Sequence, residues 1–204
     1  MPCSLEHELR LTGSGYSIIA GIDEAGRGPL SGSVFASAVV LPAGFIPQGI
    51  NDSKKLTPRV RERLHQQLTS EPDVLWAVAK KNAAEIDRLN ILRATHAAMR
   101  VAWELLEPRP DHVLIDGLPV PQFPCPQTAL VGGDAISLSI AAASIIAKVE
   151  RDREMEELDS LYASQNHIPD KGDPTPEHFA KLRLHGPCPI HRRSFAPVAQ
   201  AELF

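Results

Sequence analysis

The chain of 204 residues is 43% hydrophobic and 23% charged, a composition typical of one folded domain and unlike that of a disordered polymer or a coiled coil. Its net charge of -4 excludes a broadly basic surface, so any binding of nucleic acid must depend on local clusters of charge. Three cysteines without the spacing of a zinc site favour a reducing compartment. No apolar run approaches the ~18 residues of a membrane span, and we expect a cytoplasmic protein with no membrane contact.

Short runs rich in β-branched residues alternate with helical patterns along the chain. In chain order, the sequence predicts strands over 16–21 and 33–41, a helix over 57–70, a strand over 74–80, a long helix ending before Pro108, strands over 112–115 and 128–131, and a helix over 137–161. The proline-rich remainder predicts an irregular segment with one short helix near 177–184. This order indicates an α/β protein with a mixed sheet covered by helices and no linker between domains.

The long helix carries one apolar stripe. Its members recur every three or four residues and are Ile86, Leu89, Leu92, His96, Met99, Trp103 and Leu106. We expect this stripe to be buried and His96 to be a core histidine rather than a ligand.

Acidic residues beside glycine follow three of the predicted strands. They are Asp23 and Glu24 after the first strand, Asp116 after the fourth and Asp134 after the fifth. A single Asp–Glu pair is most often a surface turn, but open α/β sheets bind ligands at the ends of their strands. Four converging carboxylates raise one another's pKa unless a divalent cation is bound, and an oxygen-only set favours Mg²⁺ or Mn²⁺. Two such ions about 3.5–4 Å apart support hydrolysis of a phosphodiester.

Five blocks, in order, closely resemble the bacterial ribonuclease HII family. They are GIDEAGRGPLSG (21–32), NDSKKL (51–56), LIDGLP (114–119), GGDAISLSIAAASIIAKVERD (132–152) and GPCPIHRRSF (186–195). The resemblance implies one domain over 1–204, with an RNase H-like core over about 14–160 and a helical C-terminal extension over about 161–204. It also implies endonucleolytic cleavage of RNA in RNA/DNA hybrids, or 5′ to single ribonucleotides in duplex DNA.

The same resemblance assigns roles to individual residues. Asp23, Glu24, Asp116 and Asp134 match the family's metal-binding carboxylates, with Asp23 the best candidate to bridge two ions. The motif Gly26, Arg27 and Gly28 matches the element that reads the 2′-hydroxyl, chiefly through backbone groups.

Basic residues gather between positions 51 and 63. The block carries Lys54, Lys55, Arg59, Arg61 and Arg63 against Asp52 and Glu62. Ser53 and Lys54 match a family element that contacts a backbone phosphate. The three arginines form either a phosphate-binding face or a solvated helix face, and the sequence favours neither alternative.

Two further groups of charge lie nearer the C-terminus. Lys148 is a candidate for phosphate contact, whereas we interpret Arg151 and Asp152 as a structural pair. A second basic cluster serves either DNA contact or packing of the extension onto the core; it consists of His185, His191, Arg192 and Arg193.

The chain departs from the family pattern at Asp173. There the family has a tyrosine that packs on the deoxyribose after the ribonucleotide. An aspartate has no stacking face and repels phosphates unless it is neutralised, so we predict altered substrate selectivity at the RNA–DNA junction. Tyr162 either compensates from another position or is a packing residue.

Two other functions stay open. One is a junction resolvase with the same acidic site, and the other is a catalytically silent hybrid-binding module or partner subunit. The intact motif at 26–28 and the block at 186–195 favour the ribonuclease. We expect a monomer that binds nucleic acid; the apolar Leu203 and Phe204 weakly suggest a tail for a replication clamp, against simple packing or disorder.

Overall fold

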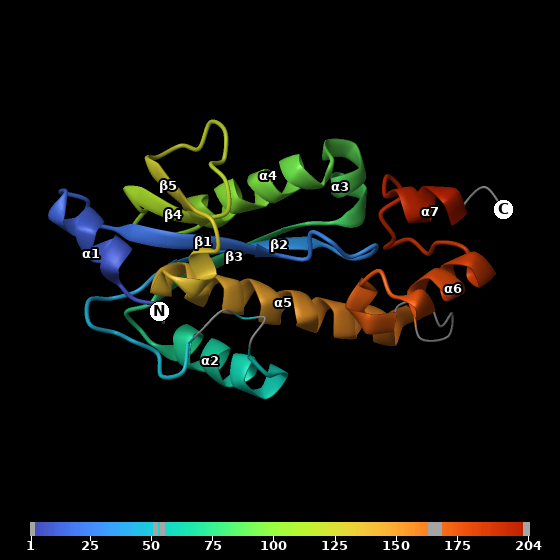
Figure 1. Ribbon diagram of the computed structural model, residues 1–204, viewed down its shortest axis with the longest axis horizontal. Coiled ribbons are helices and arrows are strands. Elements are labelled where there is room, and N and C mark those ends of the chain that lie inside the picture. Colours follow the sequence, from blue (N-terminus) through green and yellow to red (C-terminus); the bar gives the residue numbers. More distant parts are fainter. Residues whose placement is uncertain (1–2, 51–52, 54–55, 163–168, 202–204) are drawn as a thin grey trace.

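A five-stranded mixed sheet forms the centre of the fold in the computed structural model, which describes residues 3–50, 53, 56–162 and 169–201 (Figure 1). The strand order is β3-β2-β1-β4-β5. The strands are β1 (Ile19–Ala25), β2 (Val34–Val40), β3 (Leu75–Lys81), β4 (His112–Asp116) and β5 (Gln127–Leu130). The pairs β1–β2 and β2–β3 are antiparallel, whereas β1–β4 and β4–β5 are parallel. The predicted mixed sheet is confirmed.

Helices cover both faces of the sheet, with α3 and α4 on one side and α2 and α5 on the other (Figure 1). The helices are α1 (Glu6–Gly13), α2 (Pro58–Ser70), α3 (Ala83–Leu89), α4 (Ile91–Glu104), α5 (Leu138–Tyr162), α6 (Pro176–His185) and α7 (Ala196–Ala201), with 3₁₀ turns η2 (Gly133–Ala135) and η4 (Pro169–Gly172). The sequence pattern missed α1 and α7. In the part of the chain that the structure describes, no helix is both long and apolar enough to cross a bilayer.

The first strand continues further than predicted. It extends through Ala25, so Asp23 and Glu24 lie inside the strand rather than after it. Pairing with β2 continues to this point, with Asp23 opposite Ser37 and Glu24 opposite Ala36. Because β1 and β4 are parallel, with Ile22 aligned to Ile115, Asp23 and Asp116 arrive at the same edge of the sheet.

The predicted long helix is in fact two helices, α3 and α4. Asn90 lies between them with a φ of 67°, and its side chain accepts a hydrogen bond from the backbone of Arg93 at the start of α4. The break changes the helical phase, so the predicted burial of the stripe is wrong for its middle residues. Leu92 is 49% exposed and His96 is half-buried rather than in the core. The face that packs on the sheet uses Ala94, Thr95, Ala98, Met99, Ala102 and Trp103.

The helix α5 packs closely against β1 at Gly21. A methyl group at this position would lie 2.1 Å from the carbonyl carbon of Ser139 and 2.3 Å from the nitrogen of Ile140. The alanines 141, 142 and 143 of α5 are fully buried as well, as their small size predicts. This close approach lets α5 place its next turns beside the carboxyl end of β1.

Replacing Gly21 with alanine is therefore expected to lower the free energy of unfolding by about 1–3 kcal/mol, because the backbone of α5 must move away from β1. Urea denaturation of both proteins measures the change. The matched control is Gly13→Ala, where a methyl group would meet nothing within 4 Å. Equal midpoints for wild type and Gly21→Ala would show that the contact between α5 and β1 is loose.

The C-terminal extension packs against the loop that follows β1. In Figure 1, α6 and α7 lie at one end of the molecule, beside the last turns of α5. Leu30 from the loop is buried with Leu182 and Val198 from the extension. The backbone nitrogen of Leu30 donates to Gly172 at 2.8 Å, and that of Arg192 donates to Leu30 at 2.9 Å. The extension thus fixes the loop from two sides.

Candidate active site

Asp23 is buried, with 5% of its surface exposed, at the end of β1 that lies against α5. Burial raises the pKa of Asp23 well above its usual range, and the charges of Glu24 and Asp116 raise it further. Hydrogen bonds from the Ser144 hydroxyl and from the Glu24 backbone, the latter at 2.7 Å, lower this pKa but do not compensate. Three of the four predicted carboxylates therefore interact at one edge of the sheet.

Asp116 and Asp134 are linked through Gly133, the first residue of η2. The backbone nitrogen of Gly133 donates to Asp116 Oδ1 at 2.7 Å, and Asp134 follows directly and is 6% exposed. Among the described residues, no three His, Cys, Asp or Glu side chains already have the spacing of a preformed metal site. Mutual repulsion opposes closer approach of these carboxylates, and a cation would remove that repulsion.

A pocket of about 340 Å³ opens beside this cluster. The end of β1 and the loop after it form one wall, from Glu24 to Pro29, and α5 forms the other with Ser144, Lys148 and Arg151. Arg27 Nη1 lies 3.1 Å from Glu24 Oε1, while 49% of the Arg27 side chain stays exposed. The predicted substrate motif and Glu24, one of the four predicted carboxylates, thus border the same pocket.

Ser53 is joined to the carboxylate cluster through Ser144. The two hydroxyl oxygens are 2.7 Å apart, and Ser144 also bonds to Asp23. Ser53 is only 3% exposed, so its hydroxyl is held against α5. Sequence reasoning missed Ser144, whose only signal was a polar residue in the alanine-rich face of α5. Lys54 lies outside the described residues.

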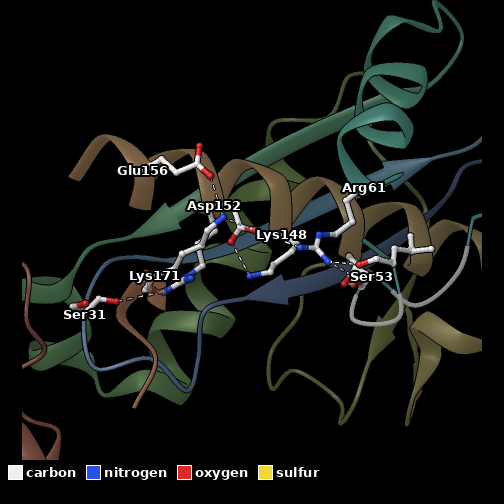
Figure 2. A network of polar contacts seen from close by, with 10 residues as sticks. Ser31, Ser53, Arg61, Lys148, Asp152, Glu156 and Lys171 are labelled. Atoms are coloured by element: carbon white, nitrogen blue, oxygen red, sulfur yellow. Dashed lines mark hydrogen bonds and ion pairs between the residues drawn. The ribbon is translucent and has the colours of Figure 1, made fainter. Parts of the chain in front are cut away.

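Lys148 takes part in a network centred on Asp152 (Figure 2). Asp152 accepts from Lys148 Nζ at 2.7 Å and from Lys171 Nζ at 3.1 Å, and Arg61 Nη2 lies 3.8 Å away. Partial burial opposes ionisation of Asp152, but the bonds and charges of the two lysines outweigh it and lower its pKa. Lys148 keeps a place on the pocket wall, with 31% of its side chain exposed.

This network corrects two interpretations. Arg151 makes no direct ion pair with Asp152, although the charge of Asp152 acts on it; its buried guanidinium donates to the Lys171 carbonyl at 3.0 Å. Arg61 is structural, since it donates to the carbonyl of Ser53 at 3.0 Å and to that of Leu56. Arg59 and Arg63 lie on exposed positions of α2.

The residues of the second basic cluster differ in their burial. Arg192 and His191 are buried, which favours packing for these two residues. The rings of His191 and His178 are joined by an Nε2–Nε2 contact of 3.0 Å, and His178 Nδ1 lies 2.9 Å from the Asp173 carbonyl. This chain of contacts anchors the segment that carries Asp173 to the end of the extension.

Asp173 is exposed and borders the same pocket. Burial lowers the pKa of Arg151, and the charge of Asp173 acts in the opposite direction, so the aspartate has a cationic neighbour. Within the described residues, Tyr162 at the end of α5 does not border this pocket.

The mixed sheet with helices on both faces and acidic side chains at the end of β1 defines an RNase H-like protein. The ribonuclease H2 of Pyrococcus horikoshii has this fold, with a TM-score of 0.79 and 29% identity over 92% of this chain and 98% of that chain. Bst-RNase HIII, solved in complex with Mn²⁺, shares the fold, with a TM-score of 0.72 and 18% identity over 91% of this chain and 69% of that chain.

Residues 20–198 match the family model described as Ribonuclease HII. The ribonuclease HII of Desulfitobacterium hafniense is 54% identical over 96% of this chain and 75% of its own length. That of Moorella thermoacetica is 52% identical over 92% of this chain and 91% of its own length. The chain belongs to the ribonuclease HII family and is an endonuclease of the ribonuclease H class.

Proposed function

We propose that the protein is a metal-dependent endoribonuclease that hydrolyses RNA in RNA/DNA hybrids and cuts 5′ to single ribonucleotides embedded in duplex DNA. The cut would leave 3′-hydroxyl and 5′-phosphate ends, as ribonucleotide excision repair requires. The observation that carries the proposal is the interaction of Asp23 with Glu24 and Asp116 at one sheet edge, directly beside the pocket of the Gly26–Gly28 loop.

Asp23, Glu24, Asp116 and Asp134 would hold two Mg²⁺ or Mn²⁺ ions. Their oxygen-only chemistry fits these hard cations, and a cation would relieve the repulsion that raises the pKa of buried Asp23. When bound, such ions supply an activated water and stabilise the leaving oxygen. The charges of both Glu24 and Asp116 act on Asp23, which supports its role as the bridging ligand.

Substrate binding would use the two walls of the pocket. The backbone of half-buried Gly26 and of exposed Arg27 and Gly28 would approach the ribose, where small residues leave room for main-chain hydrogen bonds to the 2′-hydroxyl. Lys148 on α5, together with the segment of Ser53 and Lys54, would contact backbone phosphates without reading sequence.

The proposal is tested by incubating purified protein in Mg²⁺ with a DNA duplex that contains one ribonucleotide and, separately, with a continuous RNA/DNA hybrid. We expect a cut 5′ to the lone ribonucleotide, with loss of cleavage in Asp134→Asn. Cleavage of neither substrate in Mg²⁺ or Mn²⁺ would favour a silent binding module. Cleavage of branched DNA alone would favour a junction resolvase.

The substitution Asp173→Tyr is expected to increase the preference for the junction over the continuous hybrid by about tenfold to a hundredfold, because one stacking contact is worth about 1–3 kcal/mol. The ratio of kcat/KM for the two substrates measures this preference. Asp173→Asn is the control that removes the charge near Arg151 without adding a ring. Equal ratios in wild type and Asp173→Tyr would disprove the selectivity hypothesis.

Monomeric state, cytoplasmic location and a replication-clamp contact stay predictions. Leu203 and Phe204, on which the clamp hypothesis depends, lie outside the described residues. Size-exclusion chromatography of the full chain tests the expected monomer.

A further inference from the structure

The guanidinium group of Arg192 is surrounded by carbonyl oxygens of the loop after β1. Arg192 is fully buried, and its Nη2 donates to Gly26 at 2.6 Å while Nη1 donates to Arg27 at 3.1 Å. Further bonds go from Nη1 to Pro29 at 2.6 Å and from Nε to Gly32 at 3.0 Å. Four carbonyls of one loop therefore point inward to one planar cation.

The inward carbonyls determine where the amide groups of the loop point. In a trans peptide the C=O of one residue and the N–H of the next point in opposite directions. Two amides of the loop already show this: Leu30 N donates to Gly172 at 2.8 Å, and Ser33 N donates to Glu154 at 3.2 Å. Both follow carbonyls that Arg192 binds.

The other two amides that follow bound carbonyls belong to Arg27 and Gly28. Both residues are exposed and border the pocket, and neither amide has a hydrogen-bond acceptor within the ranges that the structure describes. Each is therefore a donor that faces the pocket and is held in that direction from behind.

We propose that Arg192 is a positioning residue for ribose recognition: it binds the carbonyls of Gly26 and Arg27 and thereby directs the amide N–H groups of Arg27 and Gly28 at the 2′-hydroxyl oxygen of the ribonucleotide. The C-terminal extension then contributes to substrate selection from beneath the loop, although Arg192 itself touches no substrate. This inference rests on the proposed function and deepens its recognition step.

The test measures discrimination rather than total activity. In an Asp134→Asn background, which blocks turnover, the Kd values are measured for a duplex with one ribonucleotide and for the all-DNA duplex of the same sequence. Arg192→Lys keeps the charge but loses the planar fork, and we expect the ratio of the two Kd values to fall about tenfold, the effect of about one lost hydrogen bond. Inactive or unfolded protein affects both Kd values equally and leaves their ratio unchanged.

The matched control is Arg183→Lys, because Arg183 is an exposed arginine of α6 outside the predicted binding residues and should leave the ratio intact. An unchanged ratio in a folded Arg192→Lys protein would overturn the inference while the proposed function stands. Equal Kd values for the two duplexes in the Asp134→Asn protein itself would contradict the proposed function, and the inference about Arg192 would fall with it.

A second measurement needs no change at Arg192. In Asp134→Asn, the backbone amide resonances of Arg27 and Gly28 should shift downfield when the ribonucleotide duplex is added, and shift less with the all-DNA duplex. Equal shifts with both duplexes would contradict the inference even if Arg192→Lys does not fold.

Discussion

Replacing Asp23 with asparagine is expected to lower cleavage by about a hundredfold or more and, at the same time, to stabilise the metal-free protein. The loss of cleavage follows from the proposed bridging role, since metal ions contribute several kcal/mol of transition-state stabilisation. The gain in stability follows from burial and from repulsion by Glu24 and Asp116, which disfavour a charge at this position. Function and stability are opposed at such a residue.

The sign of the pH dependence follows from the raised pKa of Asp23 in the folded protein. Below the usual pKa of an aspartate, about 3.9, the carboxyl is neutral in both states, so wild type and Asp23→Asn should unfold alike. As the pH rises, the unfolded chain releases this proton before the folded one does, and wild type loses stability relative to the variant. A gap of about 1 kcal/mol corresponds to a difference in Tm of about 2–4 °C at this size.

Thermal unfolding in EDTA from pH 4 to pH 8 measures this gap, and added Mg²⁺ should stabilise wild type more than the variant. The control is Asp159→Asn, an exposed aspartate on α5, which should change neither cleavage nor Tm. A variant that is less stable than wild type at neutral pH would show that the Asp23 charge is compensated in the folded protein.

The substitution Gly26→Ala is expected to impair both folding and cleavage. Gly26 has a φ of +92°, and a methyl group there would lie 2.2 Å from Nε of buried Arg151 and 2.9 Å from the Ser33 carbonyl. Strain and overlap together should lower the free energy of unfolding by about 1–3 kcal/mol. The shifted carbonyl of Gly26 would also lose its bond from Arg192.

Gly28→Ala separates substrate obstruction from damage to the fold. A methyl group at Gly28 would meet nothing within 4 Å in the free protein, and its φ is outside the left-handed region. We therefore expect unchanged urea denaturation and a raised KM for the ribonucleotide duplex, because the methyl group enters the pocket. Equal stability losses in the two variants would contradict this distinction.

Most of the sheet could be predicted because its strands are local patterns of apolar residues. The ends of the elements were less predictable: Asp23 and Glu24 look like a turn after a strand, but hydrogen bonds from β2 keep them in the ladder. The break at Asn90 depends on one residue with positive φ and its cap, which a periodic stripe across 86–106 conceals.

The acidic residues could be named from sequence because strand ends and glycines mark them. The positions of the supporting groups could not. The sequence favours a structural pair for Arg151 and leaves Arg192 open between DNA contact and packing, and only the tertiary structure shows that both are buried beneath the loop. Burial lowers the pKa of Arg192 to about 9, and repulsion from Arg151 adds to this effect, a consequence of contacts between segments far apart in the chain.

The most direct test of the central claim is anomalous X-ray scattering from crystals soaked in Mn²⁺. We expect manganese at the carboxyl ends of β1 and β4, in contact with Asp23, and a weaker signal there in Asp134→Asn crystals. Manganese bound only elsewhere, for example at Asp152, or no manganese in a crystal whose site is open to solvent, would contradict the assignment of Asp23, Glu24, Asp116 and Asp134 as one metal-binding set.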